Sequence, residues 1–352
     1  MKFKDLITEI DNRLFFFFGK FKKEKRERYT SCPWIESGVC FDMGVYGSNI
    51  KLCCYLSAPG GGNSMIFTDY WGEKINWRKF FKIKNRYRNI QKNGGTIKEC
   101  KGCIFFETNN WTNKDYIDSI IVDHFTRCNC SCVYCYTEPE KERYNNLKSY
   151  NLLPVIKDMF KYNILQRGGA IGFGGGEPTI LPEFEELIEL LLDNNFDNIR
   201  IPTSGIKFSP IIAKGISTGQ LTVNISMDSA TRETYKKIKQ IDAFDKVCEN
   251  IIKYANAQTK PCFVINKYII IPEINDNKEE IMKWIDFNKE NKIEYLVIDI
   301  EQSRFEIFRE TKDSSVLELC EFAKNYAKEK GILRFEAADR LRHLVKSLKE
   351  NN

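Results

Sequence analysis

Residues 120–135 read IIVDHFTRCNCSCVYC, an apolar segment that runs directly into a loop crowded with cysteines. Three of these, Cys128, Cys132 and Cys135, are separated by three and then by two residues. A cubane iron–sulfur cluster normally takes four protein thiolates. A loop that offers three ligands leaves one iron open, as catalytic metal sites keep one position open. The spacing therefore predicts an iron–sulfur cluster with one vacant corner.

From about residue 118 onward, apolar segments alternate with amphipathic ones, the pattern of a parallel sheet covered by helices. The expected strands are residues 120–123, 170–173, 198–202, 221–226, 263–271 and 295–300. Helical spacing of apolar residues marks intervening stretches such as 182–192. Six strand–helix units predict an α/β fold, a partial (β/α)6 TIM-like barrel with its chemistry at the carboxyl ends of the strands.

The other parts of the chain are arranged around this barrel. We expect an amphipathic and basic arm at 1–30, a separate cysteine-rich module at 31–112, the barrel at 113–331 and a C-terminal helix at 332–352. The closing helix is expected over residues 336–349. A chain of 352 residues is long enough for one barrel-sized domain and a smaller module.

The cysteine loop resembles the signature of the radical S-adenosylmethionine (radical SAM) superfamily. That signature is C-x3-C-x2-C after the first barrel strand, with an aromatic residue before the last cysteine, here Tyr134. The resemblance implies that Cys128, Cys132 and Cys135 hold a [4Fe–4S] cluster whose open iron binds S-adenosylmethionine, with Tyr134 beside this cofactor. It also implies reductive cleavage of the cofactor to a 5′-deoxyadenosyl radical, which abstracts hydrogen from a substrate.

A second motif, Gly174-Gly175-Gly176-Glu177-Pro178, follows the second expected strand. Glycine runs often make turns only, but glycine also lets a ligand approach the backbone closely. In this place the run resembles the superfamily's GGE motif, which binds the methionine amino group. The resemblance therefore assigns Gly175, Gly176 and Glu177 to the cofactor.

Two further strand ends carry polar residues where the superfamily contacts the sugar and carboxylate of the cofactor. Ser204 follows the third expected strand, and Ser226 and Asp228 lie at the end of the fourth. The resemblance makes these residues candidate cofactor contacts, with Ser226 preferred. Each also suits a capping or turn role, since Ser and Asp readily bond to free backbone groups.

Cys130 departs from the superfamily pattern because it adds a fourth thiol to the loop. It could compete for iron or complete a zinc site. Four cysteines within eight residues lack the two separated ligand pairs of ordinary structural zinc sites, so an iron–sulfur cluster is favoured. The role of Cys130 stays open.

Another group of cysteines precedes the barrel, where Cys32 to Cys53 frame a hairpin-like stretch. The candidate ligands of an auxiliary [4Fe–4S] cluster are Cys53, Cys100, Cys103 and either Cys32 or Cys40, with Cys54 as a rival for Cys53. The order resembles the first half of the SPASM auxiliary-cluster module, although that module usually follows the barrel and its second half is absent here. By spacing, tetrahedral zinc is the alternative.

The formal charge of +6 is concentrated in one place. Residues 20–28 carry six basic and two acidic side chains, a local net of +4, so nucleic-acid binding is disfavoured. The apolar run 14–18 is far shorter than the roughly 20 residues of a membrane-spanning helix. Its aromatic residues are expected to pack on the protein itself, with peripheral contact to a membrane surface as the alternative. Without an export signal at its start, the chain is expected to be cytoplasmic.

The leading hypothesis is an enzyme that acts on a peptide or protein side chain, as the resemblance to SPASM-bearing maturases implies. The same chemistry on a small metabolite, sugar or lipid precursor is the alternative. A further alternative is a non-catalytic iron–sulfur or zinc scaffold, which has no use for a cofactor-binding turn at Glu177. A reducing partner such as a flavodoxin or ferredoxin is expected with the enzyme.

Overall fold

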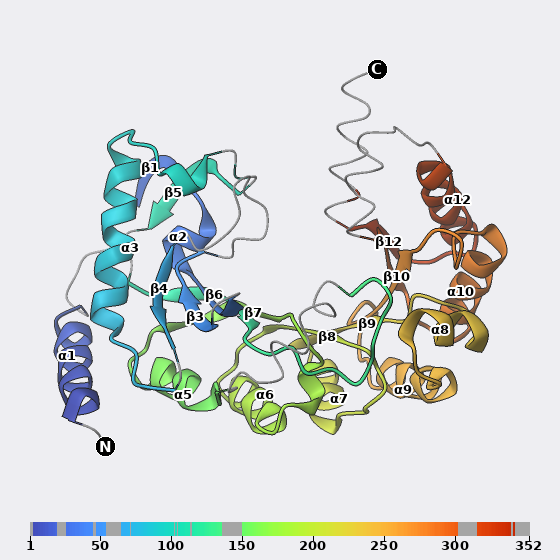
Figure 1. Cartoon of the computed structure of the whole chain (residues 1–352), viewed down its shortest axis with the longest axis horizontal. Helices are drawn as coiled ribbons and strands as arrows, with labels where there is room; N and C mark the ends of the chain where they lie inside the picture. Colours follow the sequence, from blue (N-terminus) through green and yellow to red (C-terminus); the bar gives the residue numbers. More distant parts are fainter. Residues whose placement is uncertain are drawn as a thin grey trace. The chain divides into compact units, whose positions relative to one another are not determined.

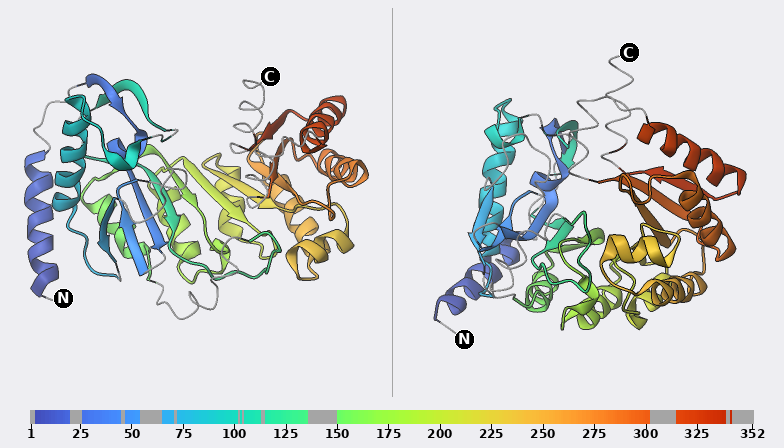
Figure 2. Two further views of the ribbon diagram at one scale, coloured as in Figure 1. Left: turned by 45° about the horizontal axis from the view of Figure 1, so that its top comes forward. Right: turned by 45° about the vertical axis from the view of Figure 1, so that its right-hand side comes forward.

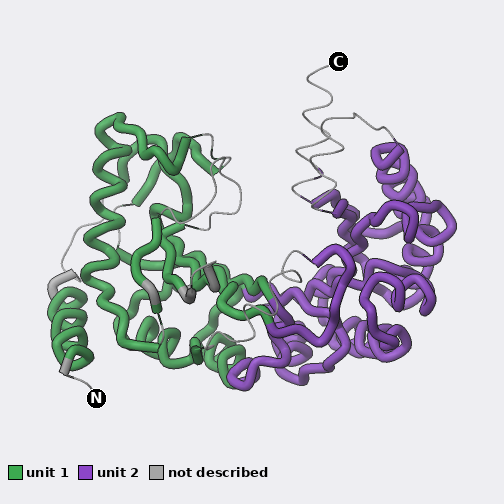
Figure 3. Tube along the Cα trace, in the orientation of Figure 1, with its two compact units in different colours: residues 1–126, 146–175, 186–198 green, residues 127–145, 176–185, 199–352 purple. Residues whose placement is uncertain are grey.

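The computed structural model describes residues 3–19, 26–44, 47–53, 65–70, 72–101, 103, 105–112, 115–135, 150–301, 315–338 and 341. The chain folds into two compact units, which Figure 3 distinguishes by colour. Unit 1 comprises residues 1–126, 146–175 and 186–198, and unit 2 comprises residues 127–145, 176–185 and 199–352. Both units combine strands with helices, so the chain is a mixed α/β protein (Figure 1).

Unit 1 contains a sheet that is parallel on one side and antiparallel on the other. Its strands follow in the order β7 (Leu165–Phe173), β6 (Ile117–Asp123), β2 (Gly38–Gly44), β3 (Gly47–Lys51) and β4 (Ile66–Asp69). β7, β6 and β2 are parallel neighbours, whereas β2, β3 and β4 pair antiparallel. The β2–β3 pair confirms the predicted hairpin between Cys32 and Cys53.

The pairing of β2 with β6 corrects the prediction that the cysteine-rich region is a separate module. Val39 lies opposite Ile120 and Phe41 opposite Val122, and all four side chains are buried. A parallel strand buries both faces and needs a hydrogen-bonding neighbour on each edge. β2 supplies that neighbour to β6, the strand that leads into the cysteine loop.

Further elements complete unit 1. They are α1 (Phe3–Gly19), α2 (Pro33–Ser37), α3 (Trp77–Lys92), the short 3-10 helix η1 (Lys98–Cys100), α5 (Leu153–Lys161), most of α6 (Phe184–Asp193) and the antiparallel pair β1 (Arg26–Ser31) and β5 (Glu107–Thr112). Figures 1 and 2 show α1 alongside α3. Phe15 and Phe16 of α1 pack on Phe81 of α3, so these two aromatic residues contact the protein itself, as expected.

Unit 2 contains an all-parallel set of strands. They are β8 (Asn198–Thr203), β9 (Leu221–Ser226), β10 (Val264–Ile270), β11 (Tyr295–Ile300) and β12 (Arg334–Ala337), in this spatial order. Apolar residues alternate along β9, where Leu221, Val223 and Ile225 are fully buried. In neither unit do the described strands close into a barrel.

The strands of unit 2 alternate with helices and a short 3-10 turn. These are η3 (Pro178–Ile180), α7 (Pro210–Ser217), α8 (Arg232–Lys239), α9 (Phe244–Asn256), α10 (Lys278–Glu290) and α12 (Ser315–Glu329). α9 shows the pattern that forms them, because Val247, Ile251 and Tyr254 recur at helical spacing and are fully buried. Strand–helix alternation thus follows the apolar periodicity of the sequence.

Strands β6 to β11 confirm the six predicted strands, and α6 confirms the predicted helix at 182–192. The C-terminal prediction needs correction. Residues 334–337 form β12, in which Tyr295 of β11 lies opposite Arg334 and Ile298 opposite Ala337. The helix predicted from residue 336 therefore does not begin there, and most of its remaining residues lie outside the described part of the chain. Of the helices that the structure describes, none has the length and apolarity needed to cross a membrane.

Candidate active site

The cysteine loop is held in place by the last turn of α8. The backbone N–H of Ser131 donates to the carbonyl of Lys239 at 3.2 Å, and that of Val133 donates to the carbonyl of Ile238 at 3.0 Å. The last carbonyls of a helix have no partner within the helix, so they are available to an adjoining loop. The N–H of Cys135 then closes a turn onto the carbonyl of Cys132 at 3.0 Å.

The sulfur atoms of Cys128, Cys130 and Cys132 lie next to one another. Hydrogen bonding to the Cys130 thiol lowers the pKa of Cys128, and it lowers the pKa of Cys132 to about 6 with help from the Lys239 ammonium group. The pKa of Cys130 itself is raised by the same contacts and by burial. Cys130 is buried, whereas Cys128 is exposed and Cys132 and Cys135 are half-buried. The three predicted ligands are thus accessible, and Cys128 and Cys132 favour the thiolate that binds metal.

Among the described residues, no three cysteine, histidine or acidic side chains have the geometry to hold a metal ion. The chemistry of the donor atoms in the cysteine loop nevertheless suits a cluster. Three accessible sulfurs on one short loop match the ligand chemistry of a [4Fe–4S] cluster with one open iron.

Tyr134 anchors the loop to a buried ion pair. Its hydroxyl donates to Oδ2 of Asp228 at 2.5 Å, and Nζ of Lys239 lies 2.5 Å from the same oxygen and 2.8 Å from the Tyr134 hydroxyl. Burial and the Asp228 carboxylate raise the pKa of Tyr134 well above its ordinary value. Burial opposes protonation of Lys239, but the Asp228 carboxylate reverses the effect and raises its pKa.

Asp228 has no contact with solvent, and its carboxylate is held from several elements. Oδ1 accepts a hydrogen bond from the N–H of Ile269 at 2.8 Å, and the Asp228 carbonyl accepts one from Nδ2 of Asn275 at 2.8 Å. The backbone of Asp228 is left-handed, with φ at 59°, a conformation that Asp tolerates better than most residues. The loop, the end of β9 and the end of α8 therefore meet at one carboxylate.

Glu177 plays a similar part at the second predicted motif. Its Oε1 accepts hydrogen bonds from Thr179 N at 3.2 Å, Thr179 Oγ1 at 2.6 Å and Thr203 Oγ1 at 2.7 Å, while Oε2 accepts from Ser204 N at 2.6 Å. Its own N–H donates to the carbonyl of Arg127 at 2.8 Å. A carboxylate offers about four lone-pair positions over two oxygens. Oε2 therefore retains capacity for one more donor, as a ligand ammonium group requires.

Gly175 is required for this turn. Its φ is 76°, and a Cβ there would lie 2.3 Å from the carbonyl oxygen of Phe125 and 2.5 Å from Oδ1 of Asp123. Any side chain would collide with backbone and carboxylate. Glycine at this position therefore lets the turn pack against Phe125 and Asp123, and the contact of Gly175 and Gly176 with a ligand stays a prediction.

The other predicted cofactor residues lie at strand ends. Ser204, after β8, donates from Oγ to Oδ1 of Asn129 in the cysteine loop at 3.0 Å. Ser226 ends β9 opposite Lys267 and is half-buried. Unit 2 therefore brings together the cysteine loop, Glu177, Ser204 and Asp228.

The N-terminal cysteines lie in unit 1. Burial and, in decreasing order, neighbouring Cys32, Cys53 and Cys103 raise the pKa of Cys100 to about 12. The N–H of Cys103 donates to the carbonyl of Cys100 at 3.2 Å. Electrostatic proximity thus groups Cys32, Cys53, Cys100 and Cys103. Cys40 instead lies on β2 opposite Lys51, and Cys54 is outside the described residues.

Sequence reasoning missed Lys239 and Asp123. Lys239 follows buried Tyr235 by one helical turn, a signal that separates it from exposed Lys236 and Lys237. Asp123 ends β6 behind the Gly175 turn, where burial and neighbouring Asp42 raise its pKa to about 7 against the opposing effect of Lys51. No pattern in the sequence marks Asp123, which is half-buried, as withdrawn from solvent.

Residues 122–285 match the family model described as the Radical SAM superfamily. The chain contains a radical SAM domain. Probable GTP 3′,8-cyclases are similar in sequence: that of Saccharolobus solfataricus is 29% identical over 165 residues, which is 46% of this chain and 50% of that protein. That of Sulfurisphaera tokodaii is 30% identical over 143 residues, 40% of this chain and 44% of that protein. The chain thus spans about half the length of these curated relatives.

A solved structure is similar over a larger part of the chain. The crystal structure of Streptococcus suis SuiB bound to precursor peptide SuiA has a TM-score of 0.52 and 13% identity, covering 81% of this chain and 60% of that one. At this identity the likeness shows the fold alone. It agrees with the mostly parallel α/β architecture predicted from the sequence, and the cofactors of a radical SAM domain are a [4Fe–4S] cluster and S-adenosylmethionine.

Replacing Lys239 with Met will leave the Asp228 carboxylate buried without its cation. Removal of one partner from a buried ion pair typically costs about 3–5 kcal/mol. Guanidinium unfolding of the Lys239→Met protein should show a loss of this order in the free energy of unfolding. Lys237→Met, on the exposed side of the same helix, should change it by less than about 0.5 kcal/mol. Equal unfolding midpoints for the two variants would contradict a structural role of the Lys239–Asp228 pair.

The raised pKa of Asp123 predicts a pH dependence of stability. Between about pH 4 and about pH 7 the native protein holds a proton on Asp123 that the unfolded chain has released, so this group makes stability fall as pH rises. Asp123→Asn should remove that contribution, and the variant should gain stability relative to wild type across the window. Unfolding curves at both ends measure it, with exposed Asp276→Asn as control. A constant difference between variant and wild type across the window contradicts the prediction.

Proposed function

We propose that Cys128, Cys132 and Cys135 hold a [4Fe–4S] cluster and that the chain binds S-adenosylmethionine at the iron they leave open. When bound, this pair of cofactors supplies a 5′-deoxyadenosyl radical that takes a hydrogen atom from the substrate. The observation that carries the proposal is the link between the two motifs: Glu177 N–H bonds to Arg127 next to Cys128, within a segment that matches the radical SAM family.

The residues around the loop would divide the work of binding the cofactor. Oε2 of Glu177 would accept from the methionine amino group, while Gly175 and Gly176 let the ligand approach the backbone. Ser204 and Ser226, at adjacent strand ends, would contact the sugar and carboxylate. Tyr134 would flank the cofactor while its hydroxyl is fixed by Asp228.

Asp228 itself is better explained as a positioning residue. Its carboxylate is fully buried and is already engaged by Tyr134, Lys239 and the N–H of Ile269. A direct contact with the cofactor would require breaking one of these bonds. We therefore propose that Asp228 holds the cysteine loop on α8 and does not touch the cofactor.

Cys130 would remain outside the ligand set. It is buried beneath the loop, while the three predicted ligands retain access to solvent. In this position its thiol lies between Cys128 and Cys132, and its one S–H would donate a hydrogen bond to either of their sulfurs. Such bonds to cluster sulfur are one of the means by which proteins adjust cluster potentials.

The substrate class has two candidates. A peptide or protein side chain is supported by the likeness to SuiB, whose structure contains a precursor peptide and which covers 81% of this chain, well beyond the radical SAM domain. A small metabolite is supported by the curated relatives, which are named for GTP and cover 46% of the chain. We propose the peptide because its support extends over both units. A non-catalytic scaffold is disfavoured, because the chain matches the radical SAM family and also contains the Glu177 turn.

We also propose an auxiliary [4Fe–4S] cluster in unit 1, held by Cys32, Cys53, Cys100 and Cys103. Their electrostatic grouping favours Cys32 over Cys40 as the fourth ligand. Zinc remains the alternative by ligand chemistry. An electron donor such as a flavodoxin or ferredoxin and a cytoplasmic location complete the proposal.

The first test is release of 5′-deoxyadenosine by anaerobically reconstituted protein given dithionite and S-adenosylmethionine. Replacement of Cys128, Cys132 or Cys135 by Ser should abolish release and remove the cluster's electron paramagnetic resonance signal. Cys130→Ser is the matched control and should retain both. Release that survives loss of Cys132, or a signal that S-adenosylmethionine leaves unchanged, contradicts the assignment.

Metal counts test the auxiliary site independently. Wild type should contain about eight iron atoms per chain, since each proposed cluster holds four. Cys100→Ser and Cys103→Ser should lower the count to about four and leave the signal of the first cluster intact. If the wild-type protein instead contains zinc and only about four iron atoms, the unit 1 site binds zinc. Cys40→Ser should lose no iron, and loss there would replace Cys32 by Cys40 as ligand.

A further inference from the structure

Helix α1 faces the rest of unit 1 with several polar residues. Thr8, Glu9 and Asn12 are buried. Oδ1 of Asn12 accepts from the N–H of Trp77 at 2.9 Å, and its Nδ2 donates to the carbonyl of Ile75 at 2.9 Å. The Asn12 side chain therefore ties the middle of α1 to the start of α3.

Ion pairs and aromatic contacts strengthen this attachment. The buried Glu9 carboxylate pairs with Lys161 of α5 at 2.5 Å and with Lys74. Phe16 packs on Phe81 at 6.0 Å between ring centroids and on Tyr162 at 5.8 Å. The orientation of α1 on unit 1 is thus fixed by contacts from α3 and α5.

The opposite face of α1 carries an apolar stripe, which we call the outer stripe. It consists of Leu6, Ile7, Ile10, Leu14 and Phe17, which are between 41% and 60% exposed. Apart from the adjacent Leu6 and Ile7, successive members are three or four residues apart, which places them along one side of the helix. They make up five of the eight large exposed hydrophobic residues in the described part of the chain. Such gathering on one short helix marks an interaction surface.

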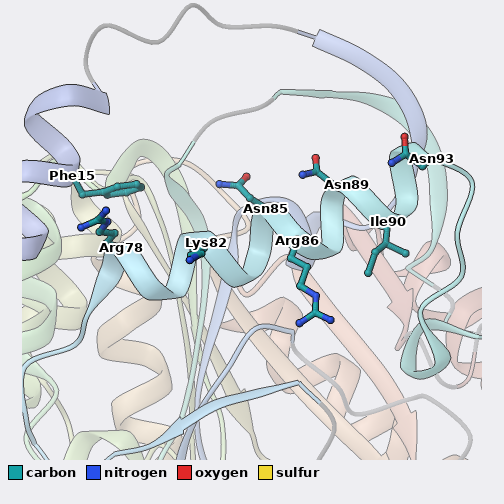
Figure 4. A pocket seen from close by; sticks show the side chains of 8 residues that line it. All are labelled: Phe15, Arg78, Lys82, Asn85, Arg86, Asn89, Ile90 and Asn93. Carbon is teal, nitrogen blue, oxygen red and sulfur yellow. The ribbon is translucent and has the colours of Figure 1, made fainter.

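A basic groove lies next to this helix. It has a volume of about 590 Å³ and is lined by Phe15 of α1 and by Arg78, Lys82, Asn85, Arg86, Asn89, Ile90 and Asn93 of α3. Figure 4 shows Arg78 beside Phe15, with the three asparagines extending from one side of α3. Among the described residues, three cations and no carboxylate line the groove, although Arg78 also pairs with Asp11 at 2.9 Å.

We propose that the outer stripe and the basic groove together bind the surface of an anionic lipid bilayer. An interfacial helix inserts an apolar face at the level of the headgroups while nearby cations meet anionic lipid. Here α1 supplies the apolar face, and Lys82 and Arg86 on α3 supply exposed cations. The sequence adds a local net charge of +4 in residues 20–28, directly after α1. No membrane-spanning helix is needed for this mode of binding.

Charge favours a bilayer over a second copy of the chain on this face. Two copies brought together through the outer stripe would also bring together two basic grooves, which repel. The helix has 17 residues, shorter than the three or four heptads of a self-sufficient coiled coil. An anionic surface satisfies the apolar and the basic residues at the same time.

The test is flotation of the full chain with lipid vesicles. The protein should float with vesicles of equal parts phosphatidylcholine and phosphatidylglycerol and should stay behind with phosphatidylcholine alone. Leu14→Gln with Phe17→Gln should lower partitioning about tenfold or more, because two inserted side chains are lost. Leu333→Gln, at a 67% exposed leucine in unit 2, is the matched control and should partition as wild type does.

A second pair of variants tests the charge independently of the apolar stripe. Lys82→Glu with Arg86→Glu should lower binding to anionic vesicles about tenfold or more, and added salt should weaken wild-type binding in the same direction. Exposed Lys283→Glu in unit 2 is the control. Far-ultraviolet circular dichroism should show the same helix content in all variants, since every substituted side chain is exposed.

Three outcomes overturn the proposal. One is equal flotation with neutral and anionic vesicles, which would remove the role of the cations. Another is equal flotation of wild type and the Leu14→Gln, Phe17→Gln protein. The third is absence of flotation together with a dimer in sedimentation that this double variant abolishes, which would assign the outer stripe to a second copy.

Discussion

The buried pair of Lys239 and Asp228 is the interaction on which the proposed site depends. It lies at the junction of the cysteine loop, the end of β9 and the end of α8, and it fixes the Tyr134 hydroxyl. Burying two charges is costly, and such a pair is retained where it specifies one arrangement among several. Here the arrangement is that of the cysteine loop on the end of α8. Backbone bonds from Ser131 and Val133 to the same helix end complete the support.

Glu177 shows a second use of a buried carboxylate in the same unit. By accepting from Thr179, Thr203 and the N–H of Ser204, it joins the glycine turn to the end of β8. The residue that the superfamily assigns to the cofactor is therefore also a structural connector. A group held from several sides loses little freedom on binding a ligand, so the turn would already be ordered before the proposed cofactor binds.

The fold was predictable where apolar residues follow one clear period. Segments such as 221–226 and 295–300 are strands in the structure because continuous or alternating apolar runs have to be buried. The pairing of β2 with β6 was missed because Gly38–Gly44 is short, includes two terminal glycines and an aspartate, and lies far from β6 in the sequence. β12 was missed for the same reason, since its four residues are ordered by β11.

The candidate site likewise has features that the sequence predicts and features that it does not. The spacing of Cys128, Cys132 and Cys135 and the Gly175–Glu177 turn are local in sequence and could be recognised directly. The burial of Lys239, the raised pKa of Asp123 and the grouping of Cys32 with Cys100 depend on contacts between distant segments. The spacing from Tyr235 distinguishes Lys239 from the other two lysines of α8, but only the packing of the helix on its neighbours shows that Lys239 pairs with a buried carboxylate.

The parallel pairing of β2 with β6 has a practical consequence for dissecting the molecule. The segment that matches the superfamily starts at residue 122, near the end of β6, and so omits both most of that strand and its β2 neighbour. A recombinant fragment cut at that boundary would carry the cysteine loop without the strand that leads into it, and a fragment starting at Ile117 would present an open edge to other molecules. The segment that matches the family and the segment that forms the complete sheet therefore begin at different residues of this chain.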